Sequence, residues 1–162
     1  PPAAPELPAG AAMVPTEPTD RAVGKPAVLG GLTAAASPSV LVVDDDPAGA
    51  TATQATLAGG GYAVAAEAEG DAVLRLVRTS LVRLVVTELY IPCAEGRCVE
   101  AALKGDRMRL PRLRVLVHTR HTARVDLEWA LGAGADAVVP KPARNELVLR
   151  EVGRLLDAAR VA

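Results

Sequence analysis

Two apolar runs that each end in carboxylates constrain this chain most. Residues 84–92 read Leu-Val-Val-Thr-Glu-Leu-Tyr-Ile-Pro, and their apolar start on consecutive positions is typical of a strand covered on both faces. A second run, 40–43, leads into Asp44-Asp45-Asp46-Pro47. In open parallel sheets the carboxyl ends of the strands form the ligand-binding edge. We therefore expect Asp44, Asp45 and Glu88 to meet at one edge.

Apolar runs alternate five times with helical patterns, which predicts parallel strands joined by right-handed crossovers. The fold class that this predicts is α/β, a flavodoxin-like (βα)5 doubly wound five-stranded parallel sheet of order 2-1-3-4-5 with helices on both faces. The expected strands are 40–44, 62–66, 84–88, 115–118 and 136–139, and the expected helices are 47–58, 71–79, 96–104, 122–131 and 143–159.

Composition divides the chain into two parts. Residues 1–38 hold eight prolines and many alanines, which predicts a flexible Pro/Ala-rich N-terminal tail or linker, with the domain at 39–162. With 18 basic against 19 acidic residues, the charge favours neither nucleic acid nor a membrane surface. No apolar run spans a membrane and no leader is visible, so we expect a cytoplasmic protein. Cys93 and Cys98 lack the further ligands of a zinc site.

The remaining strands deliver polar groups to the same edge. Thr119 follows the fourth strand and Lys141 follows the fifth. Clustered carboxylates repel one another unless a cation offsets them, and Mg²⁺ is the natural intracellular partner for oxygen ligands. Lys141 is the alternative counter-charge, so the sequence leaves a bound Mg²⁺ open.

These residues, in this order, resemble the receiver domain of bacterial two-component response regulators. The resemblance implies that Asp44, Asp45 and the backbone carbonyl of Tyr90 hold magnesium, and that Thr119 and Lys141 contact an incoming phosphoryl group. It also implies a switch whose fourth-helix to fifth-helix face binds a histidine kinase, a phosphotransfer protein or a downstream effector. The motifs that carry it are Val-Val-Asp-Asp-Asp-Pro at 42–47, Thr-Glu-Leu-Tyr-Ile-Pro at 87–92 with Glu95-Gly96, His118-Thr119, and Gly-Ala-Asp-Ala-Val-Val-Pro-Lys-Pro at 134–142.

Two positions depart from the family pattern. Glu88 stands where the family has its phospho-acceptor aspartate, and Val138 stands where it usually has a switching Tyr or Phe. The hypothesis is an atypical pseudo-receiver in phosphorelay signal transduction that acts by protein contact, is not an enzyme, and uses Glu88 as a partial mimic of the phosphorylated residue. A homodimer stays open.

Other interpretations remain. A small magnesium-dependent phosphatase of the haloacid-dehalogenase kind would use Asp44 as nucleophile and Asp46 as general acid, although Asp46 also suits a helix cap. A flavin carrier on the same fold lacks the phosphate-binding loop. Seven basic residues predict either a solvated edge or a docking surface for an acidic protein; they are Lys104, Arg107, Arg109, Arg112, Arg114, Arg120 and Arg124.

Overall fold

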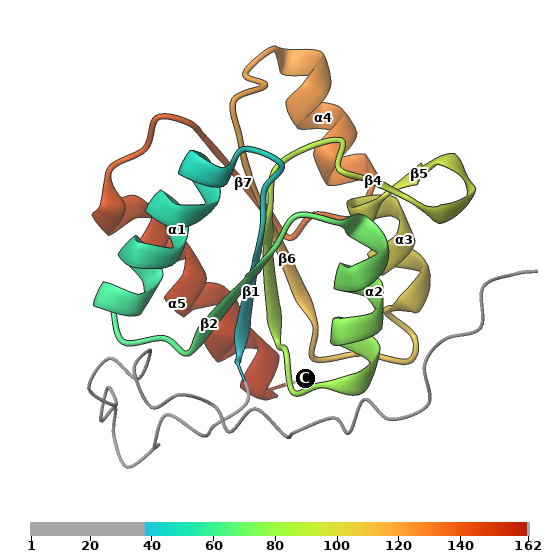
Figure 1. Cartoon of the computed structure of the whole chain (residues 1–162), viewed down its shortest axis with the longest axis horizontal. Coiled ribbons are helices and arrows are strands. Elements are labelled where there is room, and N and C mark those ends of the chain that lie inside the picture. The colour runs from blue at the N-terminus through green and yellow to red at the C-terminus, as the bar shows by residue number, and fades with distance from the viewer. Residues whose placement is uncertain (1–37, 162) are drawn as a thin grey trace, which may run out of the picture.

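The predicted parallel sheet forms the centre of the molecule. The computed structural model describes residues 38–161, so the predicted tail, apart from Pro38, lies outside the described residues. The strands lie in the order β2-β1-β3-β6-β7 and all neighbours are parallel, which confirms the expected 2-1-3-4-5 arrangement (Figure 1). Their bounds are β1 Val40–Val43, β2 Val64–Glu67, β3 Leu84–Thr87, β6 Arg114–Thr119 and β7 Ala137–Pro140.

Helices cover both faces of the sheet. On one face lie α1 (Pro47–Gly59) and α5 (Asn145–Val161), and on the other lie α2 (Gly70–Thr79) and α3 (Val99–Asp106) (Figure 1). The fourth helix, α4 (Arg124–Gly132), contacts β7. The helix order alternates with the strands as the apolar periodicity predicts.

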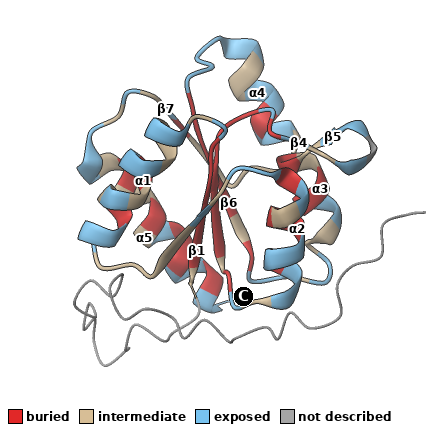
Figure 2. Cartoon of the chain, in the orientation of Figure 1, coloured by how far each residue is buried: buried red, intermediate tan, exposed pale blue. Residues whose placement is uncertain are grey.

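Alternation along the strands builds two separate cores. Val40 and Val42 of β1 pack with Leu57 and the apolar side of α5, whereas Leu41 and Val43 pack with α2 and α3. Successive side chains of a strand point to opposite faces, so one apolar run supplies both cores. Figure 2 shows the result as buried central strands between half-exposed helices. Each fully buried Val or Leu contributes about 1.5–3 kcal/mol of transfer free energy.

The segment between β3 and α3 differs from its prediction. A short antiparallel pair, β4 (Pro92–Cys93) and β5 (Arg97–Cys98), flanks the 3-10 turn η1 (Ala94–Gly96). The helix predicted from 96 therefore begins at Val99. Gly96 has φ +67°, a left-handed conformation that glycine adopts without strain, and it lets the chain reverse before the helix. Among residues 38–161, no helix is both long and apolar enough to cross a membrane.

Candidate functional site

The carboxyl edge of the sheet brings together four of the predicted site residues: Asp44 after β1, Glu88 after β3, Thr119 at the end of β6 and Lys141 after β7. Backbone hydrogen bonds fix the last steps of the strands, from Glu88 N to Val43 O at 2.8 Å and from Lys141 N to Thr119 O at 2.7 Å. The parallel register thus extends past the strands and places these four side chains beside one another, in a cluster that we call the acidic hollow.

Lys141 lies between two buried carboxylates. Its Nζ is 2.6 Å from Asp44 Oδ2 and 3.2 Å from Glu88 Oε2. The lysine side chain is 16% exposed and each carboxylate side chain 3%, so solvent screens these pairs weakly. Removing one member of such a group leaves an uncompensated buried charge. The ammonium is therefore the cation on which the hollow depends.

Glu88 is held by hydrogen bonds at both carboxylate oxygens. Oε1 accepts from Leu89 N at 2.8 Å, and Oε2 accepts from Arg120 N at 3.2 Å as well as from Lys141. Burial works to raise the pKa of Glu88, but a side-chain hydrogen bond from Thr119, the Leu89 amide and the Lys141 charge outweigh it, and the net pKa lies below its ordinary value. Glu88 is therefore ionised at neutral pH.

The start of α1 shapes the other side of the hollow. Asp44 Oδ1 accepts from Asp46 N at 2.9 Å. A Cβ at Gly49 would lie only 2.6 Å from Asp44 Oδ2, so the absence of a side chain there lets the first turn of α1 approach the carboxylate. Asp46 is the helix N-cap and accepts from Ala48 N and Gly49 N, each at 3.3 Å. The expected capping role of Asp46 is what the structure shows.

Asp45 does not enter the hollow, which corrects the expectation that it would crowd there with Asp44 and Glu88. Its side chain is 65% exposed, and its Oδ1 lies 3.8 Å from a terminal nitrogen of Arg120. Adjacent residues leaving a strand point to opposite sides, so an inward Asp44 turns Asp45 outward.

The residues present do not fit a Mg²⁺ ion as they are arranged. Asp44 and Glu88 converge on Lys141 Nζ, while Asp45 faces Arg120. Between Pro38 and Val161, no three His, Cys, Asp or Glu side chains are grouped so that they could hold a metal ion. A Mg²⁺ ion requires oxygen ligands at about 2.0–2.1 Å in near-octahedral geometry, and here two basic side chains serve as the cations.

Tyr90 anchors the loop after β3 through its side chain. It has φ +64°, and its hydroxyl donates to Asp126 Oδ1 at 2.6 Å on α4. Its ring lies 5.0 Å from that of Trp129 and 5.2 Å from that of His121, measured between centroids. The Asp126 carboxylate raises the pKa of Tyr90 to about 12. The site loop and α4 are therefore mechanically connected.

Val138 fills its position without reaching the hollow. It is half-buried on β7 and packs beside Leu89, Val117 and Ala130. A valine has no bulky side chain to rotate between solvent and core. The apolar cluster between β7 and α4 therefore contains no aromatic side chain at this position.

The sequence does not predict the contacts or the burial of three residues at or near this edge. Arg120 places its guanidinium over the acidic rim. His118 is buried, and because a carbonyl can only accept, its Nδ1–H donates to Val139 O at 2.9 Å. Burial lowers the pKa of His118. Glu100 is fully buried near the β3–α3 loop. The sequence does not predict this burial, because a glutamate in the first turn of a helix is usually exposed to solvent.

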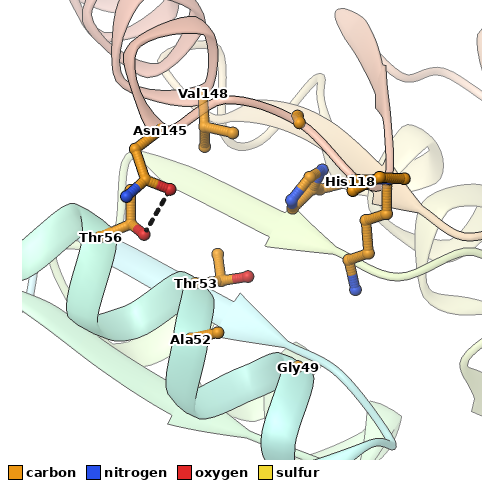
Figure 3. Close-up of a pocket in the computed structure, with 10 residues that line it drawn as sticks. Gly49, Ala52, Thr53, Thr56, His118, Asn145 and Val148 are labelled. Carbon is orange, nitrogen blue, oxygen red and sulfur yellow. Dashed lines mark hydrogen bonds between the residues drawn. The ribbon is translucent and has the colours of Figure 1, made fainter.

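A cleft of about 250 Å³ adjoins the hollow between α1 and the segment leading into α5 (Figure 3). Thr53 and His118 face it from opposite sides, and the hydroxyl of Thr56 donates to Asn145 Oδ1 at 3.2 Å across it. Lys141 also lines this cleft. The lysine therefore lies between the cleft and the acidic hollow.

The predicted basic surface is largely used inside the domain. Arg107 pairs with Asp136 at 2.6 Å, and Lys104 Nζ donates to Gly132 O at 2.8 Å. Arg114 donates to the carbonyl of Pro111, and Arg124 pairs with Glu128. The contacts of Arg107, Lys104 and Arg114 join helix ends and loops, so they favour the structural interpretation over a docking surface.

A doubly wound sheet with a buried acid–lysine cluster at its carboxyl edge matches the architecture of signalling receiver domains. The family model of the response regulator receiver domain matches residues 40–152, and the chain belongs to this family. Its fold resembles the receiver domain protein (CheY-like) from Methanospirillum hungatei JF-1, with TM-score 0.63 and 26% identity over 75% of this chain and 94% of that one.

Two curated relatives are longer proteins. The transcriptional regulatory protein AfsQ1 of Streptomyces coelicolor is 31% identical over 121 residues, covering 75% of this chain and 48% of AfsQ1. The DNA-binding response regulator MtrA of Mycolicibacterium smegmatis is 35% identical over 117 residues, covering 72% of this chain and 50% of MtrA. The chain thus spans about half the length of these relatives.

Proposed function

We propose that this receiver is an atypical member of two-component signalling that acts through protein contact, with Glu88 as a permanent partial substitute for a phosphorylated aspartate. The observation that carries the proposal is the set of donors around the Glu88 carboxylate. Lys141, Thr119 and the Arg120 amide, all of which follow or end neighbouring strands, converge on one ionised and buried group.

The contacts of Glu88 support a fixed state rather than a transfer cycle. Thr119 is fully buried and its hydroxyl helps to lower the pKa of Glu88, as the family resemblance expects of a hydroxyl that phosphoryl charge has drawn inward. Glutamate already supplies a negative charge there, although one unit and two oxygens against nearly two units and three oxygens of a phosphate. The mimicry is therefore partial.

The length of the side chain at position 88 also disfavours phosphoryl transfer. A glutamate carries its carboxylate about 1.5 Å further from the backbone than an aspartate, one carbon–carbon bond. In-line attack tolerates little misplacement, and a shift of about 1 Å costs on the order of a hundredfold in rate. Both Glu88 oxygens are, moreover, already engaged in hydrogen bonds.

The partner surface that we propose is the α4–β7–α5 face. α4 carries large apolar side chains in solvent, Val125 at 69% and Leu131 at 54% exposed. Trp129 of the same helix contacts Tyr90 in the loop two residues after Glu88. Aromatic and apolar side chains at a connected surface are typical of protein contacts. A kinase, a phosphotransfer protein, an effector or a second copy of the chain would read Glu88 through this path.

MtrA is a DNA-binding response regulator, and AfsQ1 is a transcriptional regulatory protein. The match covers about half of each relative, so DNA binding is not part of the function proposed for this chain. The near-balance of 18 basic and 19 acidic residues also gives no general attraction to a phosphate backbone. The phosphatase alternative has no observation in its favour, because Asp46 is engaged in capping α1 and Asp44 in binding Lys141.

The proposal is tested by incubating the chain with a small acyl phosphate and Mg²⁺ and measuring its intact mass. We expect no stable phosphoryl adduct on the wild type, because Glu88 is misplaced and occupied. A Glu88→Asp variant restores the family's acceptor and is expected to gain one phosphoryl group.

A Glu88→Gln variant controls for labelling elsewhere, and Glu128→Asp controls for shortening an exposed acid on α4. A wild-type adduct that disappears in Glu88→Gln would refute the proposal. An adduct on Glu88→Asp and on Glu88→Gln alike would mean that another residue is modified.

A further inference from the structure

The side chain of Arg120 lies over the rim of the acidic hollow and faces three carboxylates at once. Its Nε is 3.6 Å from Glu88 Oε2, one terminal nitrogen is 3.7 Å from Asp46 Oδ2, and the other is 3.8 Å from Asp45 Oδ1. The three acids come from the segments after β1 and β3, whereas Arg120 follows β6. The guanidinium of Arg120, after β6, is therefore close to carboxylates that follow β1 and β3.

The arginine backbone fixes where this charge can go. Arg120 N donates to Glu88 Oε2 at 3.2 Å, and the preceding Thr119 is fully buried, so the Cα of Arg120 is tied to the rim. All three side-chain distances exceed those of a hydrogen bond, which for N–H···O are about 2.7–3.2 Å. The guanidinium, at 57% exposure, is held by charge rather than by fixed hydrogen bonds. Such a cation can be displaced.

We propose that Arg120 is a built-in competitor for a divalent cation at this rim. Within residues 38–161, the four carboxylates at 44, 45, 46 and 88 have Lys141 and Arg120 as their cationic partners within ion-pair distance. Lys141 takes the two buried acids, and Arg120 takes the outer ones together with Glu88. A metal ion that reached the rim would have to push the guanidinium aside.

This inference concerns the cation at the rim and does not rest on Glu88 imitating a phosphorylated residue. It also accounts for why the carboxylates are not grouped as metal ligands. An arginine is always charged and prefers to lie between carboxylates, whereas Mg²⁺ gives up its water reluctantly. A tethered guanidinium competes at every Mg²⁺ concentration because its own concentration at the rim is fixed by the chain.

Direct titration with Mn²⁺ and Mg²⁺ tests the proposal. Calorimetry on the complete chain gives the affinity, and fluorescence of Trp129, the single tryptophan, reports on the Tyr90 loop beside the site. Arg120→Ala and the size-conserving Arg120→Gln are compared with wild type. We expect both variants to bind each ion about two- to fivefold more tightly, the change that follows from removing one competing ion pair of this exposure.

Arg124→Ala is the matched control. The Arg124 side chain is 92% exposed, and within residues 38–161 its ion pair is with Glu128 on the same helix rather than with a carboxylate of the rim. This variant should bind the ions as the wild type does. Line broadening by Mn²⁺ should then locate the new binding at the amides of residues 45, 46 and 89. Equal affinity in wild type and both Arg120 variants overturns the proposal, and so does an absence of binding in all of them, since Arg120 would then not be what excludes the ion.

Discussion

Two glutamates of this domain are both buried, and yet their pKa values are shifted in opposite directions. Glu88 is 3% exposed and Glu100 is fully buried. Glu88 has hydrogen-bond donors at both oxygens and a lowered pKa, whereas neither oxygen of Glu100 has a hydrogen-bond partner. Burial alone therefore does not decide the charge of a carboxylate; the donors that fold around it do.

The pKa of Glu100 follows from its isolation. Burial raises the pKa of Glu100 to about 7, and the charge of Glu88 adds to the rise. The surroundings of Glu88 thus favour its ionised form, whereas those of Glu100 favour its protonated form. Each prediction below changes one side of this contrast.

The largest effect is expected from Lys141→Met. It leaves Asp44 and Glu88 buried without their shared cation, and we expect a loss of about 3–5 kcal/mol in the free energy of unfolding at neutral pH. Chemical denaturation followed by circular dichroism measures it. Lys104→Met, which removes an exposed lysine bonded to Gly132 O, is the matched control and should cost about 1 kcal/mol. Equal losses in the two variants would show that Lys141 is not the counter-charge of the hollow.

Glu100 should make the domain less stable as pH rises. Its pKa is about 7 when folded against 4.5 as the reference value, so between these values the unfolded chain binds fewer protons and stability falls with pH. The loss between about pH 4.5 and pH 8 should reach ~3 kcal/mol, at 1.36 kcal/mol per pKa unit. Glu100→Gln should remove this loss. Identical pH profiles for the two proteins would contradict the assignment.

Glu88 should show the opposite pH dependence. Its folded pKa is depressed, so its stabilisation is present above pH 4.5, the reference value, and is lost as pH falls through the folded pKa. Glu88→Gln should lower the free energy of unfolding at pH 7 by about 2 kcal/mol, because hydrogen bonds to a charged group are lost, and the difference from wild type should shrink in acid. Denaturation curves at pH 7 and in acid measure both. A difference that grew on acidification would be inconsistent with an ionised Glu88.

The smallest effect concerns the rim acid Asp46. As the N-cap of α1 it should cost about 1 kcal/mol on replacement by alanine and much less on replacement by asparagine, which also caps. Thermal unfolding of Asp46→Ala and Asp46→Asn measures this. If both variants lost stability equally, the charge rather than the cap would be the contribution of Asp46.

The sequence predicts the sheet order and the convergence of strand ends because apolar runs and parallel topology determine both. It places Asp44, Glu88, Thr119 and Lys141 at one edge for that reason. It does not predict the outward turn of Asp45 or the path of Arg120, because those depend on side-chain directions after the strands end. The sequence does not predict the burial of Glu100, because an acid in the first turn of a helix normally faces solvent and interacts favourably with the helix dipole.

The central claim is that the donors around the Glu88 carboxylate lower its pKa and keep it ionised at neutral pH. Carboxyl carbon NMR of the wild-type chain, titrated with pH, tests it most directly, with Glu88→Gln and Glu100→Gln to assign the two signals. We predict that the Glu88 signal titrates below its ordinary value of 4.5 and the Glu100 signal near pH 7. A Glu88 signal that titrates at or above its ordinary value would contradict the claim.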